Sequence, residues 1–286
     1  YIGYFMRYTI NVLLFATAGS PSTTPLPGGT VEGLREAHRL GVSAMEIEWV
    51  RNVPVSQGRM EEIRSVAEGL GLALTVHAPY YVNLNSPEKA TLAASKTRVL
   101  RALEMAETAG AVSVCVHAAF NLKMEPEKVY GNVTKAVGEI MEKKAQLFPH
   151  VNLALETMGK HAQFGTLEEV LRISKEYGIY PCVDFAHIHA RYQGKFNTAA
   201  EWDALLDHYQ EALGKEALRE MHIHYSGINY GPSGERNHLR LEQSDANWKD
   251  FLRVLKKRKV GGILVCESPE SEKDTLLMQK VYQSLP

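Results

Sequence analysis

The stretch VNLALET at residues 151–157 is a strand-like apolar run that ends in a carboxylate, Glu156. Five more apolar runs of strand length end in the same way, in a histidine or a carboxylate. Successive runs are separated by roughly the length of one strand and one helix, which is the repeat of a (β/α)8 barrel. In such a barrel the carboxyl ends of the parallel strands meet at one rim, so residues far apart in sequence converge there. The five further runs are LALTVHAP (72–79), AVSVCVHA (111–118), IYPCVDFAH (179–187), MHIHYS (221–226) and GILVCES (262–268).

Length and composition are those expected of one barrel domain spanning residues 1–286. Of the 286 residues 45% are hydrophobic, and the formal net charge is −1. This apolar fraction can fill a large core, and the balanced charge argues against a general polycationic binder of nucleic acid. No stretch approaches the roughly 20 apolar residues of a membrane span. Cys115, Cys182 and Cys266 fall in predicted strands without paired spacing, so we expect reduced thiols in a cytoplasmic protein.

The chain alternates strand-like runs with helical patterns, which predicts an α/β fold. We interpret TINVLLFATAG as the first strand and residues 1–8 as a loosely held extension, because a secretory signal here would leave only seven strands. TVEGLREAHRLG is expected to be a helix that opens with a threonine cap and closes at a glycine. The alternative is a doubly wound open sheet, but residues 15–29 lack its G-x-G-x-x-G phosphate loop. The eight strands are expected near residues 10–16, 43–49, 72–77, 112–117, 151–156, 179–184, 219–225 and 261–267.

Six ionisable side chains stand at or near the ends of different predicted strands. Desolvation and mutual repulsion make such a group of charges costly in a barrel mouth, and divalent cations remove the cost by binding carboxylates and imidazole lone pairs. We therefore predict a metal centre. Histidine and carboxylate ligands without thiolate suit zinc, manganese or iron better than calcium or magnesium. The six residues are His77, His117, Glu156, Asp184, His222 and Glu267.

There are more candidate ligands than the about four that one tetrahedral ion takes. Glu156 and Glu267 could each bridge two ions, which makes them the candidate catalytic residues, because clustered ions serve in-line displacement at phosphorus.

Three further positions add to the candidate ligands. His187 follows Asp184 in a D-x-x-H pair, and the loop GPSGERNHLRLE adds Glu235 and His238. Strand alternation puts His222 and His224 on the same face, so the sequence does not choose between them.

At these positions the chain resembles the endonuclease IV family of apurinic/apyrimidinic endonucleases, and its archaeal members above all. The likeness runs from about residue 12 to the C-terminus and rests on seven motifs in the family's order. The wider superfamily includes xylose-isomerase-like sugar isomerases and epimerases on the same barrel. The motifs are VHAPYYVNLNS, CVHAAF, LALETMGK, PCVDFAHIHAR, MHIHYSG, GERNHL and VCESP.

The resemblance implies hydrolysis of the phosphodiester on the 5′ side of an abasic site in double-stranded DNA. It implies two or three zinc ions, with Mn²⁺ or Fe²⁺ as alternatives, a metal-bridging hydroxide as nucleophile, and a protein that we expect to be a monomer. The chain departs from the family at Arg236, where the family has aspartate with Glu235 one place away, and at His224, where the family has asparagine. By this resemblance His77 and His117 hold the first ion with Glu156 as bridge, Asp184, His222 and Glu267 complete the second, and His187 and His238 hold the third.

The resemblance also implies a DNA-binding surface around the rim. Tyr80 matches a tyrosine that the family inserts at the abasic gap, and Tyr81 replaces a leucine; stacking on a base is worth about 1–3 kcal/mol. Arg51, Arg191 and Arg236 fall in loops after strands, on the expected DNA side. Two alternatives stay open: a sugar isomerase or epimerase with one or two ions, and a binding barrel without catalysis. The number of candidate ligands favours the endonuclease.

Overall fold

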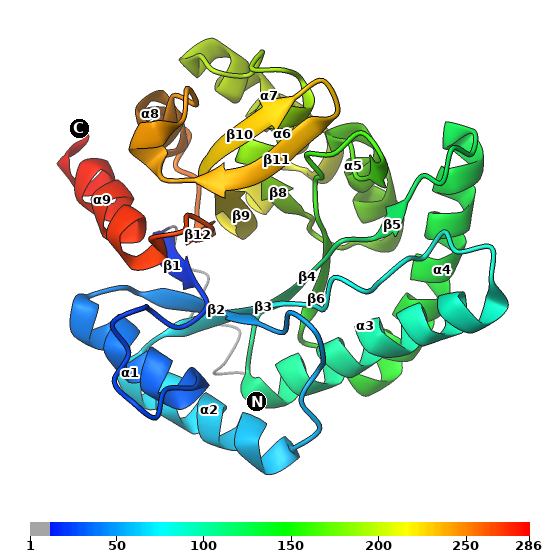
Figure 1. Ribbon diagram of the computed structural model, residues 1–286, viewed down its shortest axis with the longest axis horizontal. Helices are drawn as coiled ribbons and strands as arrows, with labels where there is room; N and C mark the ends of the chain where they lie inside the picture. Colours follow the sequence, from blue (N-terminus) through cyan, green and yellow to red (C-terminus); the bar gives the residue numbers. More distant parts are fainter. Residues whose placement is uncertain (1–11) are drawn as a thin grey trace.

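The fold is a barrel of eight parallel strands surrounded by helices (Figure 1). The computed structural model describes residues 12–286, so the extension predicted for residues 1–8 lies outside the described residues. Around the sheet the order is β6 (Asn152–Leu155), β4 (Ser113–Val116), β3 (Ala73–His77), β2 (Ala44–Glu48), β1 (Leu13–Ala18), β12 (Gly262–Cys266), β9 (Met221–Tyr225) and β8 (Cys182–Asp184).

The barrel closes between β6 and β8, which stand at the two ends of this order. Glu156 and Cys182 form a parallel bridge, and the backbone N–H of Thr157 donates to the carbonyl of Cys182 at 3.1 Å. The (β/α)8 prediction is confirmed, and the open doubly wound sheet is excluded. All eight predicted strands are present, although β1 runs on to Ala18, two residues past the predicted end.

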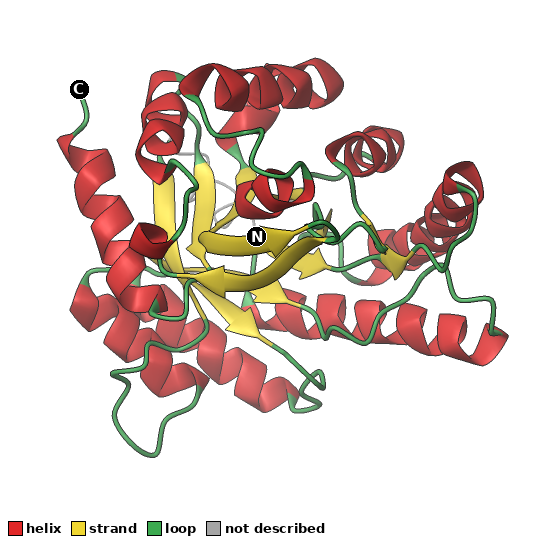
Figure 2. Ribbon diagram, turned by 45° about the horizontal axis from the view of Figure 1, so that its top comes forward, coloured by secondary structure: helices red, strands yellow, loops and turns green. Residues whose placement is uncertain are grey.

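Helices cover the outside of the barrel (Figure 2). The expected glycine stop at Gly41 is confirmed, and Gly71 and Gly110 end α2 and α3 in the same way; each has a left-handed backbone, where the absence of Cβ avoids strain. The predicted threonine cap at Thr30 is wrong, because Gly29 is the capping residue, makes no side-chain cap bond, and Thr30 is already helical. The outer helices are α1 (Thr30–Leu40), α2 (Gln57–Leu70), α3 (Lys89–Ala109), α4 (Pro126–Leu147), α5 (Leu167–Tyr177), α7 (Ala199–Leu213), α8 (Trp248–Lys257) and α9 (Ser271–Ser284).

Successive side chains along each strand point to opposite faces of the sheet, so they contribute to two separate cores. Residues such as Phe15 and Leu74 point outward into the main core beneath the helices, whereas Ala16, Ala73 and Val265 point into the lumen and form a small apolar cluster there. The rest of the lumen is lined by buried polar and thiol side chains, where a (β/α)8 barrel ordinarily packs branched apolar residues. These are Glu46, Thr75, Cys115, Cys182, His222 and His224.

Several short elements were not predicted from the sequence, and all of them except η2 follow the carboxyl ends of strands. The hairpin of β10 (Gly227–Gly231) and β11 (Gly234–Leu239) packs against the short helix α6 (Phe185–Arg191), and crosses over β8 and β9 in Figures 1 and 2. A smaller pair, β5 (Ala119–Phe120) and β7 (Gln163–Phe164), joins the loops after β4 and β6. The 3-10 helices η2 (Lys215–Arg219) and η3 (Leu241–Gln243) precede β9 and α8.

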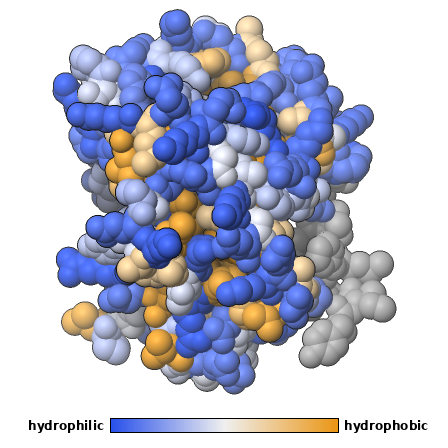
Figure 3. All heavy atoms as spheres, turned by 90° about the vertical axis from the view of Figure 1, so that its right-hand side faces the viewer, coloured by the Kyte–Doolittle hydropathy of each residue, from blue (hydrophilic) through white to orange (hydrophobic). Residues whose placement is uncertain are grey.

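The outer surface is mostly hydrophilic on the side drawn in Figure 3, with apolar residues interspersed. Among residues 12–286, no helix combines the length and the hydropathy needed to cross a bilayer.

Candidate metal centre

Glu156 lies at the middle of the rim and presents its two oxygens to two separate sets of histidines. Its Oε2 is 2.7 Å from Nε2 of His117 and 3.4 Å from Nε2 of His77. Its Oε1 is 3.3 Å from Nδ1 of His187 and 3.4 Å from Nδ1 of His224. A carboxylate that faces imidazole nitrogens on both oxygens has the geometry needed to bridge two cations.

The side of the site beyond Oε1 is built from β8, α6 and the loop after β12. Asp184 ends β8 and caps α6 by accepting the backbone N–H of His187 at 2.7 Å, which fixes the D-x-x-H pair at the helix start. Oδ2 of Asp184 is 3.3 Å from Nδ1 of His187, and Oε2 of Glu267 is 3.4 Å from Nδ1 of His224. Ligand atoms of Glu156, Asp184, His187 and Glu267 all lie within 4.8 Å of one another.

Beyond the two sides of Glu156, a further group of candidate ligands includes residues of the β10–β11 hairpin. His238 on β11 forms a possible cation-binding group with His187 and Glu267, and Oε2 of Glu235 is 3.3 Å from Nε2 of His187. Glu235 therefore points toward His187, whereas Arg236 is exposed to solvent.

The structure separates His222 from His224, which the sequence alone does not. His224 stands at the level of the rim, beside Glu156 and Glu267. His222 lies two residues earlier on β9 and deeper in the lumen, with Nδ1 3.1 Å from Oγ of Ser113 and Nε2 2.9 Å from Oε2 of Glu46. His224 therefore lies level with the rim carboxylates, and His222 lies one layer below it, beside Glu46.

Sequence reasoning missed Glu46 and Glu48. Both lie on β2 and face the lumen, and burial raises the pKa of Glu48 to about 8. The alternation Ala44, Glu46, Glu48 in AMEIEW was the available signal, because it places two carboxylates on the face opposite to Met45 and Ile47.

The buried polar atoms at the rim are consistent with a site for divalent cations. Six of them have no hydrogen-bond partner, and leaving such an atom unsatisfied costs about 1–3 kcal/mol. Burial also raises the pKa of Asp184 to about 8, so this carboxyl is protonated at neutral pH unless a cation neutralises it. The donors thus fit divalent metal ions. The six atoms are Nε2 of His77, Oε1 of Glu156, Oδ2 of Asp184, Nε2 of His187, Nδ1 of His224 and Oε2 of Glu267.

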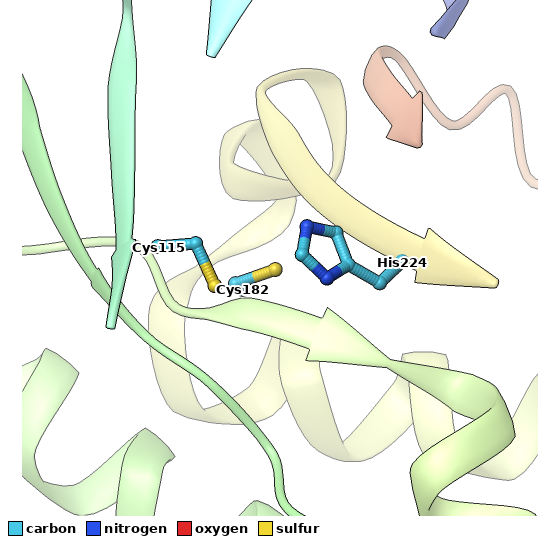
Figure 4. Close-up of side chains that lie close together, drawn as sticks. All are labelled: Cys115, Cys182 and His224. Carbon is cyan, nitrogen blue, oxygen red and sulfur yellow. The ribbon is translucent and has the colours of Figure 1, made fainter. Parts of the chain in front are cut away.

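Two thiols lie just below this group. Cys115 on β4 and Cys182 on β8 point toward each other and toward His224 (Figure 4). Sγ of Cys115 donates to Oε2 of Glu156 at 3.2 Å. Burial and the neighbouring Cys182 raise the pKa of Cys115, which keeps the thiol protonated as a donor to the bridging carboxylate. All three cysteines are free and buried, as expected.

The candidate DNA-binding residues take different positions. Tyr80 packs its ring 5.0 Å from the rings of both His77 and His117 and is 40% exposed, whereas Tyr81 is 63% exposed. Arg51 is exposed as well.

Arg191 has a structural contact that the sequence did not suggest. Its Nη1 donates to the backbone carbonyls of Met158, Lys160 and Gln163, so this end of the guanidinium braces the loop after β6. The neighbouring His189 is buried, with Nδ1 2.8 Å from the Phe196 carbonyl and Nε2 3.2 Å from Oδ1 of Asp245.

Comparison with known proteins defines the class. Residues 34–284 match the family described as the xylose isomerase-like TIM barrel, and the chain belongs to that family. An uncharacterised protein of Methanocaldococcus jannaschii is 35% identical over 274 residues, which cover 96% of this chain and 98% of the relative. A probable endonuclease 4 of Oceanobacillus iheyensis is 26% identical over 171 residues, 57% of this chain and 55% of that protein.

Two solved structures show the same barrel. Endonuclease IV from Thermus thermophilus has a TM-score of 0.70 at 21% identity, with 95% of this chain and 98% of that chain covered. A D-tagatose 3-epimerase-like protein has a TM-score of 0.68 at 17% identity, with 94% and 96% covered. At these identities the likeness establishes the fold, and the reaction has to be argued from the site.

Proposed function

We propose that the protein is a metal-dependent endonuclease that hydrolyses the phosphodiester 5′ to an abasic site in double-stranded DNA. The observation that carries the proposal is Glu156, whose two oxygens face two separate sets of imidazoles. The group formed by His187, His238 and Glu267 adds a further set of donors. A reaction that uses a single ion needs about four ligands and would leave several of these groups without a role. The relatives named probable endonuclease 4 support the same choice.

Each candidate ligand would have a distinct role in this reaction. His77 and His117 would hold one ion, Glu156 would bridge it to a second held by Asp184, His224 and Glu267, and His187 with His238 would hold a third. Bound divalent ions of this kind activate water at neutral pH and neutralise charge on phosphate oxygens. Cys115 holds the bridging carboxylate in place by its hydrogen bond.

Two tyrosines beside the ions would bind the damaged strand. Tyr80 closes one wall of the site over His77 and His117, and Tyr81 stands free at the edge, where its ring could stack in the gap left by a missing base.

A sugar isomerase or epimerase is the second candidate, and Glu48 is the observation that favours it. A buried carboxyl with its pKa raised to about 8 can exchange a proton near neutral pH, as moving a proton beside a carbonyl requires. The solved epimerase-like structure shares the barrel.

One assay distinguishes the endonuclease from the sugar isomerase or epimerase. Protein loaded in turn with Zn²⁺, Mn²⁺ and Fe²⁺ is incubated with a duplex that carries a single tetrahydrofuran abasic analogue. The endonuclease predicts a single nick 5′ to the analogue that is abolished by a chelator and by Glu156→Ala. Glu168→Ala, which removes a glutamate 61% exposed on α5, is the matched control and should nick normally. Absence of nicking with every metal, together with turnover of a ketose, would establish the second candidate instead.

A further inference from the structure

Below the rim, three buried side chains form a compact group that the proposed reaction does not use as a unit. Glu46 on β2 meets His222 and His224 on β9, and the relative exposures of the three residues are 0%, 3% and 0%. Nε2 of His222 is 2.9 Å from Oε2 of Glu46, and Nε2 of His224 is 3.0 Å from Oε1. The two Nε2 atoms are 3.3 Å apart.

These distances are those between the ligand atoms of a metal ion. Nitrogen and oxygen ligands about 2.0–2.1 Å from Zn²⁺ at tetrahedral angles are roughly 3.3 Å from one another. Two imidazoles and one carboxylate are also the ligand set of several catalytic zinc sites and of non-haem iron sites.

Hydrogen bonds alone do not account for the group. Neither carboxylate oxygen of Glu46 receives a hydrogen bond of acceptable geometry from the described residues. Without a metal, a proton on His224 supplies the charge that compensates this buried carboxylate, and a divalent cation would take over that role. Oγ1 of Thr75, on the strand position paired with Glu46, is also buried and unsatisfied, and offers a contact for a water at the open coordination position.

A contact between Nδ1 of His222 and Ser113 fixes the orientation of the His222 ring. Its Nδ1 contacts Oγ of Ser113 at 3.1 Å, and that hydroxyl is 3.5 Å from Nδ2 of Asn152. Metal-binding histidines usually have a hydrogen-bond partner on one ring nitrogen. This partner orients the ring so that the other nitrogen faces the cation.

We propose that Glu46, His222 and His224 form an inner site for one divalent transition-metal ion, separate from the rim centre. His224 is shared, because its Nε2 faces Glu46 while its Nδ1 faces Glu156 and Glu267. With both sites filled, His224 would offer Nε2 to the inner ion and Nδ1 to the rim ion, and its ring proton would pass to solvent. The inner site does not depend on the reaction proposed above, since it concerns only how many ions the chain binds.

Metal counting tests the inner site. Chelator-stripped protein is titrated with Co²⁺, followed by visible absorption, and bound metal is measured by mass spectrometry after gel filtration. His222→Gln and Glu46→Gln should each bind one equivalent fewer than the wild type. His208→Gln, which alters a half-exposed histidine on α7 paired with Glu168, is the matched control and should bind the wild-type number. Equal stoichiometry in the wild type and both folded inner-site variants would overturn the proposal.

A second measurement covers the case in which the variants do not fold. Crystals of the wild-type protein soaked in Zn²⁺ should give an anomalous peak about 2.0–2.2 Å from the Glu46 carboxylate and from Nε2 of His222 and His224. Rim peaks without an inner peak would reject the inner site and leave the proposed endonuclease intact. An inner peak in a protein that fails to nick abasic DNA would support the inner site and reject the endonuclease.

Discussion

Glu156 is the residue on which the rim centre depends most, because its two oxygens face the two sets of histidines. Glu156→Gln keeps the shape of the side chain but replaces one anionic oxygen by an amide NH₂, which cannot accept a cation. We expect the variant to lose about two equivalents of bound metal, and nicking of abasic DNA to fall at least about a hundredfold. Metal content by mass spectrometry and single-turnover nicking measure the two effects. A variant that retained the full metal content would contradict the bridging role.

Tyr81 allows a test of the DNA contact without disturbing the metals. It is 63% exposed, so replacing it should leave folding unchanged. Tyr81→Ala should weaken binding of a duplex with an abasic analogue by about 1–3 kcal/mol, the value of one stacking contact, whereas Tyr81→Phe should bind like the wild type. Fluorescence anisotropy with chelated protein measures this difference. Equal affinity of the alanine variant would remove Tyr81 from the interface.

One physical reason explains why Glu46 and Glu48 were not predicted as site residues from the sequence. His77, Glu156 and Glu267 stand out because each is the ionisable residue that ends an apolar run. Glu46 lies inside its strand, followed by Ile47 and Glu48, so the run reads as a strand with one polar face turned to solvent. Only closure of the barrel turns that face into the lumen. The level of His222 and His224 relative to the carboxylates of other strands likewise depends on strand register, which β9 acquires from its neighbours.

The β10–β11 hairpin is the element that brings Glu235 and His238 to the rim, and Gly234 fixes its position. Gly234 has φ +91°, and a Cβ there would lie 2.0 Å from the carbonyl oxygen of Gly159. The backbone N–H of Glu235 donates to that same oxygen at 3.1 Å.

Gly234→Ala should therefore move the hairpin away from the loop after β6 while the barrel stays folded. We expect the loss of about one equivalent of metal, because His238 and Glu235 are displaced together, with the far-ultraviolet spectrum unchanged. Gly58→Ala is the control, since a Cβ at that helical position meets nothing within 4 Å. Full metal content in Gly234→Ala would show that the hairpin does not position a ligand.

Elements with strong periodicity were predictable, and short ones that depend on neighbours were not. Thr166 and Thr198 begin helices with complete capping boxes to Glu169 and Glu201, so α5 and α7 carry their own start signals. The hairpin and α6 carry weaker local signals: GINYG begins and ends with glycine, GERNHL begins with one, and their pairing includes an irregular register after Asn229. Their order comes from packing on each other and on the rim.

The whole barrel encloses more ionisable groups than its interior can keep charged without cations. Burial acts to lower the pKa of His77, His187 and His224, but neighbouring groups hold each well above its ordinary value. The metal-free fold therefore keeps protons that metal ions would displace. Burial lowers the pKa of His117 and His222, which opposes this effect in part.

The stability of the metal-free protein should accordingly fall as pH rises from about 5 to 8. Asp184 and Glu48 have folded-state pKa values raised to about 8, so between their unfolded values and 8 the native state binds more protons than the unfolded state. Each such group lowers the free energy of unfolding by up to roughly 1.4 kcal/mol per pH unit across that window, and the loss levels off above about pH 8. Bound cations hold the same carboxylates ionised, so the metal-loaded protein should show no such fall. Thermal unfolding at pH 5, 6, 7 and 8, with chelator and with Zn²⁺, should give two melting temperatures that diverge as pH rises. Curves that stay parallel over this range would mean that the buried carboxyls are not where the metal binds.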